Sequence, residues 1–145
     1  MPGSLQLRKE AGVCQRPLAS AAGMMSYILV AEDEPHILVL IQRKLESAGY
    51  TVVSTENGDD ALQRALEKKP SLLLLDVMLP GREGLEICDE VKRFYGSEAP
   101  PVILMSARGQ QMDVEAGVEA GADDYIIKPF SPRLLLERVE AMLTG

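Results

Sequence analysis

The chain has 145 residues, 46% of them hydrophobic and 26% charged, which is typical of one globular domain with a hydrophobic core and too short for two. No apolar run approaches the roughly 20 residues of a membrane-spanning helix, and the net charge of −7 argues against binding to the phosphates of nucleic acid. The two cysteines, Cys14 and Cys88, form no CxxC motif and have no companion histidines, which argues against a disulfide framework or a zinc site and favours a reducing cytoplasm.

The first segment of the chain differs from the rest in charge and pattern. Residues 1–24 carry a net charge of +2, and residues 25–145 carry −9. The first segment is rich in Ala, Gly, Pro and Ser, and it lacks the apolar core of a secretory signal. We interpret residues 1–25 as a leader or flexible extension and residues 26–145 as the domain. A transit peptide and an artefact of start-site choice are the alternatives.

Five short apolar runs follow along the chain. They are YILVA at 27–31, TVVST at 51–55, SLLLL at 71–75, PVILM at 101–105 and YII at 125–127. None shows a clean alternation of polar and apolar residues, which indicates strands that are covered on both faces.

The segments between these runs have helical spacing. Ile37, Leu40, Ile41 and Leu45 lie on one stripe of the first helix, and the last helix is expected to begin at Pro132 after a capping Ser131. The segment 107–120, with only a partial stripe, is predicted as the fourth helix. This alternation predicts an α/β fold with a doubly wound, five-stranded parallel sheet and helices on both faces.

Polar residues stand where the predicted strands end. Glu32 and Asp33 follow the first strand, Asp76 ends the third, Ser106 the fourth and Lys128 the fifth. In doubly wound sheets these carboxyl ends form the active crevice. Clustered carboxylates repel one another unless a cation lies among them, and oxygen ligands suit Mg²⁺. A carboxylate can also accept a phosphoryl group.

These residues resemble the receiver domain of bacterial response regulators over roughly residues 26–144. The motifs AEDEP at 31–35, LLLLDVMLPGREG at 73–85, ILMSA at 103–107 and DDYIIKPFSP at 123–132 occur in the expected order. The chain most resembles the winged-helix (OmpR/PhoB-like) class. The resemblance implies a flavodoxin-like fold, with strand order 2-1-3-4-5 and five helices.

The resemblance also implies a phosphorylation-activated signalling switch that uses Mg²⁺ and is not a turnover enzyme. Its phosphoryl donor would be a sensor histidine kinase or a phosphotransfer protein, and its acceptor Asp76. The implied metal ligands are Asp33, Asp76 and the backbone carbonyl of Met78, with Glu32 acting through water. The implied phosphoryl-binding and switch residues are Ser106, Lys128 and Tyr125, and the bond between Lys128 and Pro129 is expected to be cis.

Two positions depart from the family pattern. Met78 and Arg108 occupy positions that tune dephosphorylation in the family, and Met78 cannot orient an attacking water as a carboxamide could. We therefore expect slow loss of the phosphoryl group.

The face formed by the fourth helix, fifth strand and fifth helix is expected to bind a partner. Asp124 and Arg138 match one pair of the crossed salt bridges through which the winged-helix class dimerises, whereas Val114 and Leu134 replace another charged pair. The dimer contact is then partly apolar, or the face binds another partner, or the fourth helix is rotated so that Val114 is buried instead of Glu115.

Three other functions are alternatives to the switch. A degenerate receiver would act as a constitutive protein-binding module. A phosphatase of the haloacid-dehalogenase type needs a second Asp where Met78 stands, and a nucleotide or flavin module needs a Gly-rich turn where EDEP stands. The chain is expected either to act alone or to be a part of a longer regulator, and not to bind DNA itself.

Overall fold

The computed structural model describes residues 26–107, 117 and 119–144. The expectations for residues 1–25, Arg108 and Val114 lie outside the described residues. None of the described helices is long and apolar enough to cross a membrane.

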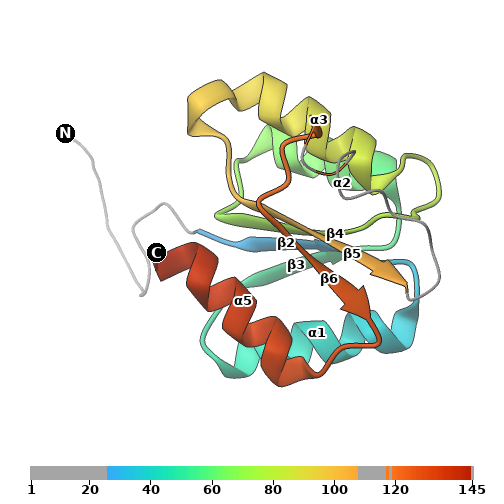
Figure 1. Cartoon of the computed structure of the whole chain (residues 1–145), viewed down its shortest axis with the longest axis vertical. Helices are drawn as coiled ribbons and strands as arrows, with labels where there is room; N and C mark the ends of the chain where they lie inside the picture. Colours follow the sequence, from blue (N-terminus) through green and yellow to red (C-terminus); the bar gives the residue numbers. More distant parts are fainter. Residues whose placement is uncertain (1–25, 108–116, 118, 145) are drawn as a thin grey trace.

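Five parallel strands form one sheet (Figure 1). They are β2 (Ile28–Ala31), β3 (Val52–Thr55), β4 (Leu72–Asp76), β5 (Val102–Ala107) and β6 (Asp124–Lys128). The strands lie in the order β3-β2-β4-β5-β6, which is 2-1-3-4-5 when they are numbered along the chain. The predicted fold class and strand order are therefore confirmed.

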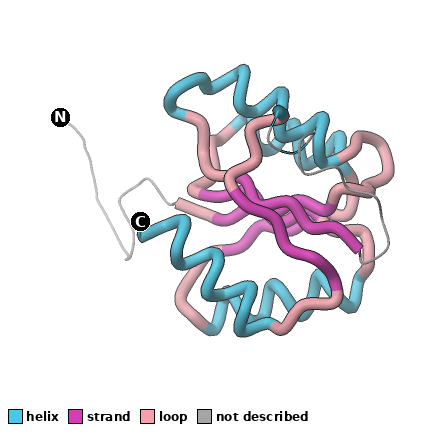
Figure 2. Tube along the Cα trace, viewed as in Figure 1, coloured by secondary structure: helices cyan, strands magenta, loops and turns pink. Residues whose placement is uncertain are grey.

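Helices cover both faces of this sheet (Figure 2). The described part of the chain contains α1 (Pro35–Ser47), α2 (Gly58–Glu67), α3 (Gly84–Tyr95) and α5 (Pro132–Thr144), with a short 3-10 helix at Gly96–Glu98. The predicted fourth helix falls mostly on residues that the structure does not describe, although Gly117 and Glu119 are helical. Four of the five expected α-helices are therefore seen in the described residues.

The apolar runs are continuous because each strand contributes to two separate hydrophobic clusters. On β4, Leu73 and Leu75 pack in the cluster beneath α2 and α3, whereas Leu72 and Leu74 pack in the cluster beneath α1 and α5. Alternate residues of a strand point to opposite faces, so a strand with both faces covered needs apolar residues throughout.

The predicted stripe on α1 is wrong at one position. Leu38, Ile41 and Leu45 form the buried face, whereas Leu40 is 43% exposed. The spacing of 38, 41 and 45 is as helical as the predicted one, so the local pattern alone did not distinguish the two.

The helix that begins at Pro132 starts as expected. The Ser131 hydroxyl accepts a hydrogen bond from the Leu134 N–H at 3.0 Å, which satisfies one of the unpaired donors of the first turn. This cap fixes the point at which the chain leaves the site at Lys128 and enters α5.

Candidate functional site

Three carboxylates meet at the carboxyl end of the sheet. Glu32 and Asp33 follow β2, Asp76 is the last residue of β4, and these two strands are hydrogen-bonded neighbours. One oxygen from each of the three side chains lies within 4.8 Å of the others. Glu32 and Asp76 are buried and Asp33 is exposed, so the cluster is closed toward the sheet and open toward solvent.

Lys128 joins the two buried carboxylates. Its Nζ atom lies 2.7 Å from Glu32 Oε1 and 3.2 Å from Asp76 Oδ2, and only 13% of its side chain is exposed. This contact comes from the last residue of β6, two strands away from β4. Lys128 thus places one positive charge among three negative ones.

Burial and the neighbouring charges act in opposite directions on the pKa of each of these groups, and the net shift is upward in all three. Burial raises the pKa of Glu32 and of Asp76 above their ordinary values, and the contact with Lys128 offsets only part of that effect. Burial on its own would lower the pKa of Lys128, but the hydrogen bond to Glu32 and the charge of Asp76 raise it. The ammonium is therefore held in its charged form by its partners.

The main chain around Asp76 is tightly fixed. The Met78 N–H donates to Asp76 Oδ1 at 3.2 Å, and the Val77 N–H donates to the Met105 carbonyl at 2.8 Å. A Cβ atom at Gly84 would lie 2.4 Å from the Asp76 carbonyl oxygen, so α3 begins directly against the backbone of Asp76. Glycine at this position is required by that close approach.

The other predicted site residues lie at or near the same edge of the sheet. Ser106 is fully buried in β5, and Tyr125 on β6 is partly buried and packs against the cluster beneath α2 and α3. The peptide bond between Lys128 and Pro129 is cis, in agreement with the expectation. Met78 follows β4 and is 53% exposed.

The residues present fit a divalent cation. The donors are hard carboxylate oxygens, as Mg²⁺ prefers, and they lie close enough together to share one ion. When all are ionised, the three carboxylates and Lys128 carry a net charge of −2, which one divalent ion would balance. The exposed Asp33 leaves the site open to water and to a phosphoryl group.

This arrangement is matched by a known family. Residues 28–140 match the response regulator receiver domain. The chain belongs to that family. Receiver domains are signalling switches of two-component systems and use Mg²⁺ at an acidic pocket, which here corresponds to Glu32, Asp33 and Asp76.

Two curated relatives are similar to this receiver domain. The transcriptional regulatory protein ResD of Bacillus subtilis is 43% identical over 116 residues, which cover 80% of this chain and 47% of ResD. The alkaline phosphatase synthesis transcriptional regulatory protein PhoP of the same organism is 42% identical over 120 residues, covering 83% of this chain and 49% of PhoP. The receiver domain thus spans about half the length of these relatives.

Solved structures have the same fold. A response regulator from Chloroflexus aurantiacus is 33% identical, with a TM-score of 0.76, and the match covers 83% of this chain and 99% of that one. The BeF3-activated receiver domain of RstA from Klebsiella pneumoniae is also 33% identical, with a TM-score of 0.73 and coverage of 83% and 100%.

The expected partner face is described only in part. Asp124 and Arg138 pair with each other within the chain, because Arg138 Nη1 lies 2.7 Å from both carboxylate oxygens. Leu134 on α5 is 36% exposed, and Ile127 on β6, which the sequence did not single out, is also exposed. The face therefore carries exposed apolar side chains beside an ion pair.

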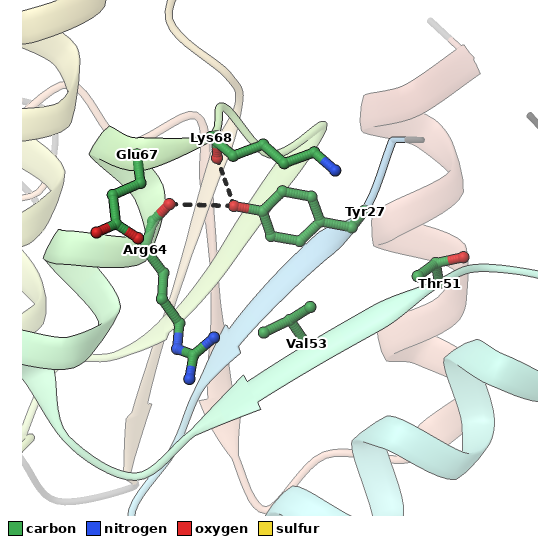
Figure 3. Close-up of a pocket in the computed structure, with 6 residues that line it drawn as sticks. All are labelled: Tyr27, Thr51, Val53, Arg64, Glu67 and Lys68. Carbon is green, nitrogen blue, oxygen red and sulfur yellow. Dashed lines mark hydrogen bonds between the residues drawn. The ribbon is translucent and has the colours of Figure 1, made fainter. Parts of the chain in front are cut away.

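A pocket of about 230 Å³ lies at the opposite edge of the sheet, where the strands begin (Figure 3). It is lined by Tyr27, Thr51, Val53, Arg64, Glu67 and Lys68. The pocket thus shares no residue with the acidic site.

The sequence reasoning missed the residues that hold the loop after Asp76. Arg82 in this loop contacts Asp59 at the start of α2 and Glu90 on α3. These partners lie 23 and 8 residues away along the chain, and no local pattern in the sequence signals either contact.

Proposed function

We propose that this receiver domain is a switch that is activated by transfer of a phosphoryl group to Asp76. The observation that supports it best is the position of Asp76 at the end of β4, between the ammonium of Lys128 and the carboxylates of Glu32 and Asp33. A buried carboxylate without a positively charged partner raises the free energy of the folded state. The excess of carboxylates over ammonium groups here therefore suits a site that binds a cation together with a phosphoryl group.

In the proposed reaction, a carboxylate oxygen of Asp76 attacks the phosphorus of a phosphohistidine on a kinase or a phosphotransfer protein. The new O–P bond forms as the P–N bond breaks, and the released imidazole takes up a proton. Mg²⁺, held by Asp33, Asp76 and the Met78 carbonyl with Glu32 acting through water, would neutralise charge on the phosphoryl oxygens. Lys128 and the Ser106 hydroxyl would bind those oxygens from the protein side.

The output is a shift between two conformations. In the proposed active state, Ser106 moves toward the phosphoryl group and Tyr125 moves inward, which changes the face that includes β6 and α5. Met78 cannot orient an attacking water, so the phosphoryl group is lost slowly. The changed face then controls dimerisation or another protein partner.

The test is the intact mass of the chain after incubation with acetyl phosphate, with and without Mg²⁺. We expect the wild type to gain one phosphoryl group only with Mg²⁺, and Asp76→Asn to gain none. Asp89→Asn is a matched control, because Asp89 is paired with Arg93 on the outside of α3, and it should behave as wild type. A wild type without mass gain would support the alternative, a degenerate receiver that binds its partner constitutively.

A further inference from the structure

The loop of residues 77–83 joins β4 to α3 and carries Met78, so its position fixes where the Met78 carbonyl lies. The start of α2 holds this loop through backbone contacts. The Gly58 N–H donates to the Pro80 carbonyl at 2.8 Å, and a Cβ atom at Gly58 would lie 1.9 Å from the Arg82 carbonyl oxygen. Gly58 is thus required for the close approach of α2 to the loop.

Arg82 adds two side-chain contacts that tie the same loop to two helices. Its Nε atom lies 3.1 Å from Asp59 Oδ1 on α2, and its Nη1 atom lies 2.6 Å from Glu90 Oε2 on α3. Only 34% of the Arg82 side chain is exposed. The planar guanidinium can hold both carboxylates at once, so the loop is fixed between α2 and α3.

We propose that Arg82 is a positioning residue of the metal site: it ties the loop to Asp59 and Glu90 and so holds the Met78 main chain where its carbonyl can bind Mg²⁺. The inference rests on the proposed function for the role of the Met78 carbonyl. Arg82 itself acts only through the loop, four residues along the chain from Met78.

The sign of the effect separates positioning from simple electrostatics. Removing a positive charge near an acidic site would, by Coulomb attraction alone, tighten the binding of a divalent cation. Loss of positioning has the opposite effect, because the loop then samples positions in which its carbonyl is not a ligand. Weaker Mg²⁺ binding by Arg82→Ala therefore identifies positioning.

The first measurement is Mg²⁺ affinity by titration calorimetry. We expect Arg82→Ala to bind Mg²⁺ about two- to fivefold more weakly than wild type, in line with the modest strength of partly exposed ion pairs. Arg82→Lys keeps the charge and should recover part of the loss. Arg93→Ala is the matched control. It also removes one arginine charge, but Arg93 lies on α3 and is paired with Asp89 rather than with the loop. This variant should not weaken Mg²⁺ binding.

The second measurement is amide hydrogen exchange without metal. Arg82→Ala should speed exchange within the loop of residues 77–83 and leave exchange in β2 unchanged, because a local opening of the loop does not unfold the sheet.

The inference would be overturned if Arg82→Ala bound Mg²⁺ as tightly as wild type or more tightly. It would also be overturned if amide exchange in this variant rose as much in β2 as in the loop. The two proposals can fail separately. If the wild type binds Mg²⁺ but accepts no phosphoryl group, the proposed function fails, and the comparison of the Arg82 variants still decides the role of Arg82.

Discussion

At the scale of single residues, Lys128 determines how two carboxylates can be buried next to each other. Glu32 is fully buried and Asp76 nearly so, and each lies within 3.2 Å of the Lys128 ammonium. A buried charge that loses its partner costs far more than the pair itself contributes. The stability of the metal-free domain should therefore depend strongly on Lys128.

Replacing Lys128 with Ala should lower the free energy of unfolding without metal by about 3 kcal/mol, because Glu32 and Asp76 are left without their cation. Added Mg²⁺ should restore more stability to this variant than to wild type, because the ion would supply the missing positive charge. Urea unfolding in a chelator and in Mg²⁺ measures both effects. Equal stability of the two proteins in the chelator would contradict this reading.

Met78 should control how long a phosphoryl group stays on Asp76. Its side chain is exposed beside the site and has no group that could orient a water molecule. Met78→Asn should shorten the lifetime of the phosphorylated form by about tenfold, because the carboxamide can position the attacking water. The decay of the phosphorylated mass over time measures this. Met78→Leu is the control, and decay of Met78→Asn at the wild-type rate would refute the assignment.

The site residues were predictable because they stand at strand ends. Asp76, Ser106 and Lys128 each follow an apolar run, and parallel strands bring their carboxyl ends to one edge. Arg82 was not predictable, because it acts through side chains of two helices that only the folded chain brings together.

At the scale of elements, two tyrosines fix the end of α2. Tyr27 directly precedes β2, and its hydroxyl donates to the carbonyls of Arg64 and Lys68 (Figure 3). The Tyr95 hydroxyl, at the end of α3, donates to the Ala65 carbonyl. The Arg64 carbonyl also accepts from the Lys68 N–H at 3.2 Å. The two tyrosine hydroxyls add contacts that connect the end of α2 to both of its neighbours.

Tyr27→Phe should lower the free energy of unfolding by about 1 kcal/mol at pH 7, because carbonyls of α2 lose a donor. Burial raises the pKa of Tyr27 above 10, so the fold favours its neutral form. That contribution is complete below pH 10 and is lost as pH rises through the higher pKa of the folded state. Urea unfolding at pH 7 and above pH 10 measures this effect. Between these two conditions, Tyr27→Phe should lose less free energy of unfolding than wild type. An identical pH dependence in the two proteins would exclude this role for Tyr27.

The five strands were predicted within two residues from their apolar runs, and the start of α5 was predicted from its cap at Ser131. The buried face of α1 was predicted wrongly at one position, since Leu38 and Leu40 both fit a helical stripe. The choice between them depends on how α1 packs against β2 and α5, which is a tertiary property.

At the scale of the whole molecule, the face on β6 and α5 should respond to phosphorylation. In the unphosphorylated chain, Arg138 and Asp124 satisfy each other, and a dimer with crossed salt bridges would have to exchange this pair between subunits. Exposed Leu134 and Ile127 lie on the same elements and offer apolar surface to a partner.

Sedimentation with and without beryllofluoride, a phosphoryl mimic, should detect a dimer only in the presence of the mimic. Leu134→Glu should abolish that dimer, because it places a charge in the contact. Phe94→Glu is the matched control, because Phe94 is an exposed apolar residue on α3, on the other side of the sheet. A wild type that stays monomeric in both states would remove the dimer hypothesis.

The packing of α5 beside α1 also has a consequence for synthesis on the ribosome. The cluster beneath α2 and α3 takes its buried residues from the chain up to Leu104, whereas the other cluster needs Leu135 and Val139 from α5. A nascent chain can therefore bury most of the first cluster while the apolar face of α1 is still uncovered. Chaperones that protect emerging chains would encounter this face until the 13 residues of α5 leave the tunnel and close it.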